Sequence, residues 1–236
     1  MFNGKNKAIT FSYDDGVTQD KRLIEIFNKY GLRSTFNLNS ELLGKARSLT
    51  YSGVTVDHIK VKPEDVKHIY DGHEVAVHTL THPNLTEIPD DEEVIRQVEQ
   101  DRLSLSELAG YEVFGMAYPC GGVNCNDRVA DIIRNNTPIK YARTITTTKC
   151  FEPYTDLYQY KGTVSSFGEW EDMLRLGREF IELETDTPQV LYIWGHSYEF
   201  DLKPERWEMF DEFCRMISGK PDIFYGTNIE ILTKKA

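Results

Sequence analysis

Two pairs of residues in this sequence have the types and the spacing of a metal-dependent active site. His78 and His82 stand four residues apart, and Asp14 and Asp15 are adjacent in the run Phe-Ser-Tyr-Asp-Asp-Gly. Two imidazoles and one carboxylate form the three-ligand set of a catalytic metal centre, which keeps one position open for water. The remaining carboxylate can then take the proton of that water. The combination predicts a metal-dependent hydrolase.

Each pair also has a simpler interpretation when it is considered alone. Two histidines at this spacing are often solvated neighbours, and Asp-Asp-Gly is an ordinary turn sequence. Residues four apart on a helical turn share one face, so both imidazoles can reach one ion, although Pro83 limits that turn to a loop. The metal interpretation is favoured because both pairs are expected on the same face of the fold.

The expected secondary structure alternates short apolar strands with amphipathic helices, which is typical of an α/β fold with a mostly parallel sheet. About seven strands favour a distorted (β/α) barrel over a flat sheet, in a single domain that spans residues 1–236. Residues 39–60 and 146–167 are expected to be irregular. The expected strands are 7–12, 34–38, 74–77, 113–117, 140–145, 189–194 and 222–225, and the expected helices are 18–30, 63–70, 90–108, 127–135, 169–183 and 204–217.

Most of the polar residues that could do chemistry follow directly after expected strands. In a parallel α/β fold those strand ends share one face, and that face holds the active site. We therefore expect these residues to converge in space although the sequence separates them. They are Asp14, Asp15, His78, His82, Cys120 in the turn Pro-Cys-Gly, Arg143 and His196.

Two of these residues have roles that the chemistry of hydrolysis suggests. His196 titrates near neutral pH and can protonate a leaving group, although a single histidine at a strand end is as often structural. The backbone N–H of Cys120 lies in a turn that can approach a ligand closely, and it can stabilise an oxyanion. Cys120 as a nucleophile is the weaker alternative, because no base with an orienting partner is evident. We expect structural roles for His58, His68 and His73.

The composition excludes several classes of partner. The 236 residues are 40% hydrophobic and 28% charged, which allows a sizeable core, and the net charge is −11. An acidic protein repels nucleic acid and anionic membrane surfaces, and it weakly favours neutral or cationic glycans over anionic ones. Residues 1–7 show no apolar signal segment, and the four cysteines form no C-x-x-C pair. A cytoplasmic protein with reduced thiols is therefore expected, and nothing in the sequence indicates an oligomeric state.

The ordered motifs resemble those of the polysaccharide deacetylase family, carbohydrate esterase family 4. That family carries T-F-D-D-G, H-[ST]-x-x-H and R-x-P-x-G motifs and a late strand that ends in a histidine. The corresponding segments here are residues 11–16, 78–82, 117–121 and 193–196, which span most of the chain. The resemblance implies a distorted (β/α) barrel with deacetylase activity.

Carried over position by position, the resemblance also implies a role for each site residue. Asp14 is then the general base, His196 is the acid, and the Cys120 N–H is an oxyanion donor. The divalent ion, zinc or alternatively cobalt or nickel, is held by Asp15, His78 and His82.

Besides Ser12 and Tyr13, which replace Thr and Phe in the first motif, the sequence departs from the family pattern in two ways. Ala117 stands where the third motif has an arginine, which pairs with the base and lowers its pKa. Arg143, at the end of another expected strand, can substitute for that arginine, although it also has a structural interpretation. No fourth motif, whose aspartate orients the acid histidine, is evident. The candidates for this orienting role are Asp156, Asp172 and Glu199.

The expected function is the removal of acetyl groups from N-acetylated carbohydrate, with a metal-bound water activated by Asp14. One alternative keeps the site and changes the substrate to an O-acetyl ester or a cyclic amide. Another is a carbohydrate-binding protein that retains the metal without catalysis, which the alanine at position 117 would explain. The intact Asp14 and His196 favour an enzyme.

Overall fold

A nine-stranded sheet forms the centre of the computed structural model, which describes residues 2–233. Its strands are β1 (Lys7–Asp14), β2 (Ser34–Leu38), β5 (Glu74–Val77), β6 (Gly115–Ala117), β7 (Tyr141–Thr147), β8 (Tyr160–Gly162), β9 (Val164–Ser165), β10 (Gln189–His196) and β11 (Ile223–Tyr225). They follow the order β8-β7-β6-β5-β2-β1-β10-β9, with β11 beside β1. Every pair of neighbours is parallel.

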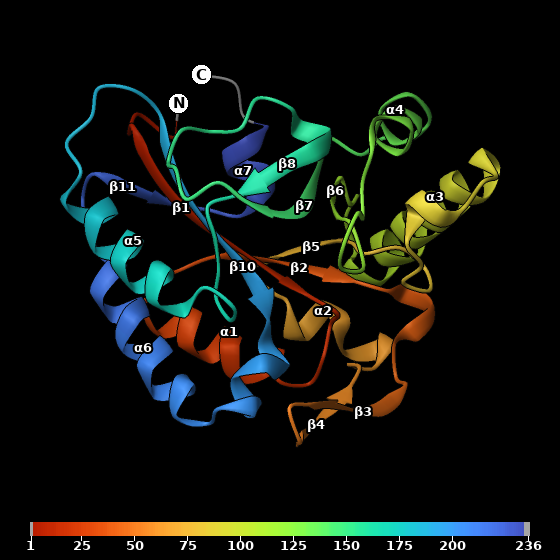
Figure 1. Cartoon of the computed structure of the whole chain (residues 1–236), viewed down its shortest axis with the longest axis horizontal. Coiled ribbons are helices and arrows are strands. Elements are labelled where there is room, and N and C mark those ends of the chain that lie inside the picture. The colour runs from red at the N-terminus through yellow and green to blue at the C-terminus, as the bar shows by residue number, and fades with distance from the viewer. Residues whose placement is uncertain (1, 234–236) are drawn as a thin grey trace.

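The helices are α1 (Asp20–Lys29), α2 (Val66–Ile69), α3 (Asp91–Ala109), α4 (Asp127–Asn136), α5 (Trp170–Glu182), α6 (Glu205–Ile217) and α7 (Asn228–Leu232). Figure 1 shows α1, α5 and α6 packed together on one side of the molecule, whereas α3 and α4 lie at the other end, near β5 and β6. Among residues 2–233, none of the helices has the length and apolar character that a membrane crossing requires.

The expected α/β fold with a mostly parallel sheet is confirmed. All seven expected strands are in the sheet, and β8 and β9 are additions from a segment that was expected to be irregular. These two strands end the sheet on either side, and they do not pair with each other, so the sheet is not closed. Helix α7 is a further addition near the end of the described chain.

Strand β1 lies inside the sheet, and all eight of its residues are buried. Such fully buried strands are typical of parallel sheets. The ring of Phe11 packs against Phe27 of α1 and Phe210 of α6, with ring centroids 4.6 and 6.2 Å apart. This packing holds the carboxyl end of β1, and therefore Asp14, in a defined position.

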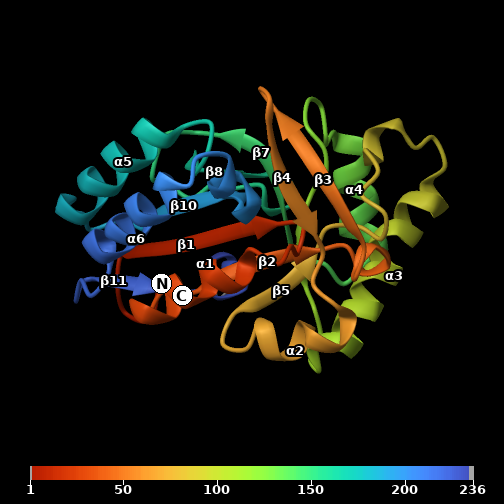
Figure 2. The same ribbon diagram turned by 90° about the horizontal axis from the view of Figure 1, so that it is seen from below.

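The segment that was expected to be irregular between β2 and β5 contains a β-hairpin, so that expectation was wrong. Its strands, β3 (Ala46–Tyr51) and β4 (Val54–Ile59), pair antiparallel and form a separate two-stranded sheet. Ser52 and Gly53 join them with φ of 49° and 82°, as a two-residue hairpin turn requires. Figure 2 shows the hairpin projecting from the central sheet.

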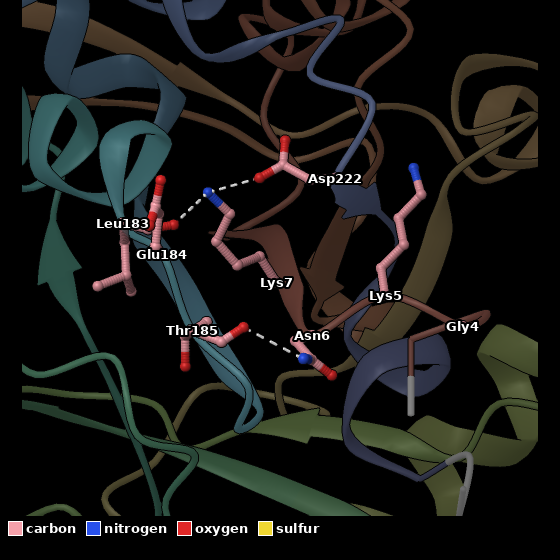
Figure 3. A pocket seen from close by; sticks show the side chains of 8 residues that line it. All are labelled: Gly4, Lys5, Asn6, Lys7, Leu183, Glu184, Thr185 and Asp222. Atoms are coloured by element: carbon pink, nitrogen blue, oxygen red, sulfur yellow. Dashed lines mark hydrogen bonds and ion pairs between the residues drawn. The ribbon is translucent and has the colours of Figure 1, made fainter.

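At the amino ends of the strands, a cavity of about 410 Å³ has a structural explanation. Figure 3 shows Lys7 at its centre, where the Nζ atom pairs with Asp222 at 2.8 Å. The same Nζ donates to the carbonyls of Phe180, Ile181 and Leu183 at the end of α5. A cation at this position satisfies the unpaired carbonyls and the negative end of the helix dipole.

Candidate active site

The carboxyl ends of the parallel strands surround a pocket of about 310 Å³. Asp14 ends β1, His78 follows β5, and His196 ends β10. The structure brings all the residues expected at this face together, since each either lines the pocket or contacts a residue that does. The pocket-lining members are Asp14, Asp15, His78, His82, Cys120 and His196, and Arg143 lies beneath Asp14.

Asp15, His78 and His82 form a group that can hold a metal ion, because their ligand atoms all lie within 4.8 Å of one another. The Nδ1 of His78 lies 2.8 Å from the carbonyl oxygen of Ala117, which can only accept, so Nδ1 carries the proton and the Nε2 lone pair is free. Burial lowers the pKa of His78 to about 4 and also lowers the pKa of His82. Both imidazoles are therefore neutral, as metal ligands must be. The donor set fits zinc, cobalt or nickel.

The hairpin supplies two buried partners to Asp15. Lys60 Nζ lies 2.9 Å from Oδ1 and His58 Nε2 lies 3.1 Å from Oδ2. Burial opposes the ionisation of Asp15, but Lys60 and His58 hold its pKa well below the usual value. Each carboxylate oxygen has a second lone pair, so these bonds orient the carboxylate without preventing coordination. His58, for which a structural role was expected, orients Asp15 from beside the site, and Lys60 was missed.

Asp14 forms a buried ion pair with Arg143. The Nη2 atom of Arg143 lies 2.5 and 2.6 Å from the two carboxylate oxygens, and Asn37 donates to Oδ1 at 2.8 Å. The guanidinium also packs over the ring of Trp194, 4.7 Å from its centroid. Burial opposes the ionisation of Asp14, but Arg143 outweighs it together with nearby histidines and lowers the pKa. Since Ala117 and Arg143 are register partners on β6 and β7, the arginine comes from the strand next to the third motif.

His196 faces Asp14 across the pocket, with 3.9 Å between Nε2 and Oδ2. Its Nδ1 lies 3.1 Å from Oε1 of Glu199, in the 3₁₀ segment η5 (Ser197–Leu202), and its backbone N–H donates to Oε2 at 3.1 Å. Burial alone lowers the pKa of His196, but Glu199 and then Asp14 raise it, to about 9. Of the three candidate orienting residues, Glu199 is the one that contacts His196. Asp156 instead binds Arg134, and Asp172 binds Lys149 and Arg175.

We expect Glu199→Gln to shift the alkaline limb of the pH profile of kcat/KM to lower pH by about one unit or more. The neutral amide no longer stabilises the imidazolium, so His196 loses its proton at a lower pH. The matched control is Asp172→Asn, which also removes a carboxylate but lies away from His196. An alkaline limb that stays in place in Glu199→Gln would contradict the orienting role.

Cys120 lies in a strained turn beside the candidate metal ligands. Its φ is 69°, and Asp15, Thr79 and His82 also have positive φ, of 84°, 65° and 63°. Such conformations cost about 1–3 kcal/mol each and cluster at functional sites. No acceptor in the described residues takes the backbone N–H of Cys120, which leaves it available to a ligand. Burial raises the pKa of the Cys120 thiol, which does not favour a nucleophilic thiolate.

A profile of polysaccharide deacetylases matches residues 3–138, which is more than half of the chain. The chain belongs to the polysaccharide deacetylase family. Curated protein sequences include no match to this chain.

Solved structures similar to this chain include the peptidoglycan deacetylase PdaC from Bacillus subtilis (18% identity, TM-score 0.57, 96% of this chain and 90% of that chain covered). A family 4 carbohydrate esterase from Streptomyces lividans, in complex with acetate, is also similar (15% identity, TM-score 0.59, 94% of this chain and 93% of that chain covered). A third is BA3943, a CE4 family pseudoenzyme from Bacillus anthracis (16% identity, TM-score 0.57, 96% of this chain and 66% of that chain covered). At these identities the likeness shows the fold, which is similar to the (β/α) barrel of the family.

Proposed function

We propose that this protein is a metal-dependent hydrolase that removes acetyl groups from N-acetylated carbohydrate, with zinc bound by Asp15, His78 and His82. The observation that carries the proposal is the grouping of these three ligands in one pocket with Asp14 and His196. When bound, the ion supplies Lewis acidity, which polarises the acetyl carbonyl and acidifies water.

The surrounding residues perform the proton transfers. Asp14, kept ionised by Arg143, accepts a proton from the water that attacks the acetyl carbon. The N–H of Cys120 donates to the carbonyl oxygen as that oxygen gains negative charge. His196, which Glu199 keeps protonated at neutral pH, gives its proton to the amide nitrogen, so acetate and a free amine leave.

The family and the pocket both support a glycan substrate. One similar structure is a peptidoglycan deacetylase and another is a carbohydrate esterase with acetate bound. Trp194 and Tyr51 line the pocket with partly exposed side chains and offer aromatic faces on which sugar rings can pack.

We expect acetate release from N-acetylated chitooligosaccharides to fall about a hundredfold or more when metal is stripped, and to return with zinc, cobalt or nickel. Metal content is measured on the same samples. Stoichiometric metal without acetate release would contradict N-deacetylation, and acetyl esters and cyclic amides would then be assayed. A protein that binds no metal would contradict the assignment of Asp15, His78 and His82.

A further inference from the structure

The β3–β4 hairpin forms one wall of the active-site pocket. Side chains alternate between the two faces of β3, and the face that carries Arg47, Leu49 and Tyr51 lines the pocket beside the candidate metal ligands. On β4, Val56 is buried in a small cluster with Tyr198 of η5, which anchors the hairpin. A wall that projects from the central sheet (Figure 2) can determine which substrate binds without altering the catalytic groups.

Arg47 differs from the other cations at this site because it has no anionic partner. Arg143 pairs with Asp14, and Lys60 pairs with Asp15. The Nε–H of Arg47 donates to Nδ1 of the buried His58, on the other strand of the hairpin, at 3.2 Å. Within residues 2–233, no acceptor takes a hydrogen bond from its two Nη groups, and no carboxylate lies within ion-pair distance. A guanidinium thus lines the pocket with its two terminal nitrogens unpaired.

We propose that Arg47 binds a carboxylate on the substrate, so that the natural substrate is an acidic N-acetylated glycan. This inference rests on the proposed function and names its substrate class. His58 links the two charges, since its Nδ1 contacts Arg47 and its Nε2 lies 3.1 Å from Asp15. The guanidinium is therefore one imidazole ring away from a candidate metal ligand. A carboxylate bound there belongs to the acetylated sugar itself or to its direct neighbour.

The residues next to Arg47 suit a sugar ring that carries such a group. Tyr51 is 46% exposed, and its ring stacks on the buried ring of Tyr198, with centroids 6.5 Å apart and planes at 14°. A tyrosine supported in this way presents an apolar face to a pyranose ring, while the guanidinium binds a planar carboxylate through two N–H groups. The net charge of −11 does not prevent this contact, because charges beyond about 8–10 Å are largely screened at physiological salt.

The test compares matched oligosaccharides that differ in the carboxylate. The neutral probe is N-acetylchitotetraose, one acidic probe carries a uronate beside N-acetylglucosamine, and another carries the lactyl ether of N-acetylmuramic acid. We expect kcat/KM and calorimetric affinity of the wild type to favour at least one acidic probe by about tenfold to a hundredfold. Arg47→Gln should lose that preference, so that the ratio of the acidic to the neutral values falls to about one.

Two further variants separate direct binding from general charge and from folding. Arg47→Lys retains the charge and should keep part of the preference, whereas Lys45→Gln removes an exposed charge outside the pocket and should keep all of it. Zinc stoichiometry in Arg47→Gln must equal that of the wild type. A wild type that prefers the neutral probe, or an unchanged preference in Arg47→Gln, would overturn the proposal. If no probe releases acetate, the proposed function fails, and the calorimetric affinities still decide whether Arg47 binds a carboxylate.

Discussion

Replacing Asp14 with asparagine should lower kcat by about a thousandfold while leaving the metal bound. The amide has nearly the shape of the carboxylate but cannot accept a proton from water. Asp14 is also outside the group of three candidate metal ligands, so the change removes no ligand. The measurement pairs acetate release from N-acetylated chitooligosaccharides with the zinc content of the same purified protein.

The neighbouring change, Asp15→Asn, is the matched control, because it should weaken zinc binding by about a hundredfold or more. Asp14→Asn leaves Arg143 buried without its anion, which costs about 3–5 kcal/mol, so thermal unfolding must show that the variant is folded at the assay temperature. A folded, zinc-loaded Asp14→Asn protein with wild-type turnover would refute the assignment of the general base.

The convergence of the site could be predicted from the sequence because parallel strands leave little freedom at their ends. Asp14 and His196 show this directly, since they are register partners on β1 and β10. Once both strands are recognised and taken to be neighbours, the 3.9 Å approach of their side chains follows from the pairing. Strand pairing did not predict which carboxylate orients His196, because three carboxylates were candidates. The contact with Glu199 depends on the 3₁₀ turn that brings a residue three positions later back to the imidazole.

The sequence of the β3–β4 hairpin contains a turn pattern, but the polar composition of the segment obscured it. Ser52 and Gly53 form a two-residue turn between runs that alternate apolar and polar residues, which is a strong hairpin pattern. Its contacts with the site had no such signal. Lys60 reaches Asp15 because the chain after β4 folds back and bridges to Val17, and no local sequence pattern encodes that return.

Replacing Arg143 with alanine should lower kcat/KM about a hundredfold and move its acidic limb to higher pH. The guanidinium holds the pKa of Asp14 below its usual value against the effect of burial. Without that cation, burial raises the pKa, so a larger fraction of Asp14 is protonated at a given pH and cannot act as a base. The pH profile of kcat/KM measures this shift, and an acidic limb that does not move would contradict the pairing argument.

Transplanting the arginine to position 117 tests whether its strand of origin matters. Ala117 and Arg143 are register partners, and such residues on neighbouring strands lie about 4.8 Å apart with side chains on the same face. In the double variant Arg143→Ala, Ala117→Arg, an arginine at the family position can enter the space that Arg143 leaves, so the buried volume changes little. We expect the double variant to recover at least about tenfold of the lost kcat/KM and to return the acidic limb to lower pH.

Ala117→Arg alone is the control, because it places two guanidinium groups beside one carboxylate and should destabilise the fold. Recovery in the double variant would mean that a cation beside Asp14 is the requirement, and that the two strands are alternative sources of it. A folded double variant without recovery would mean that the position over Trp194, which only β7 provides, is part of the requirement.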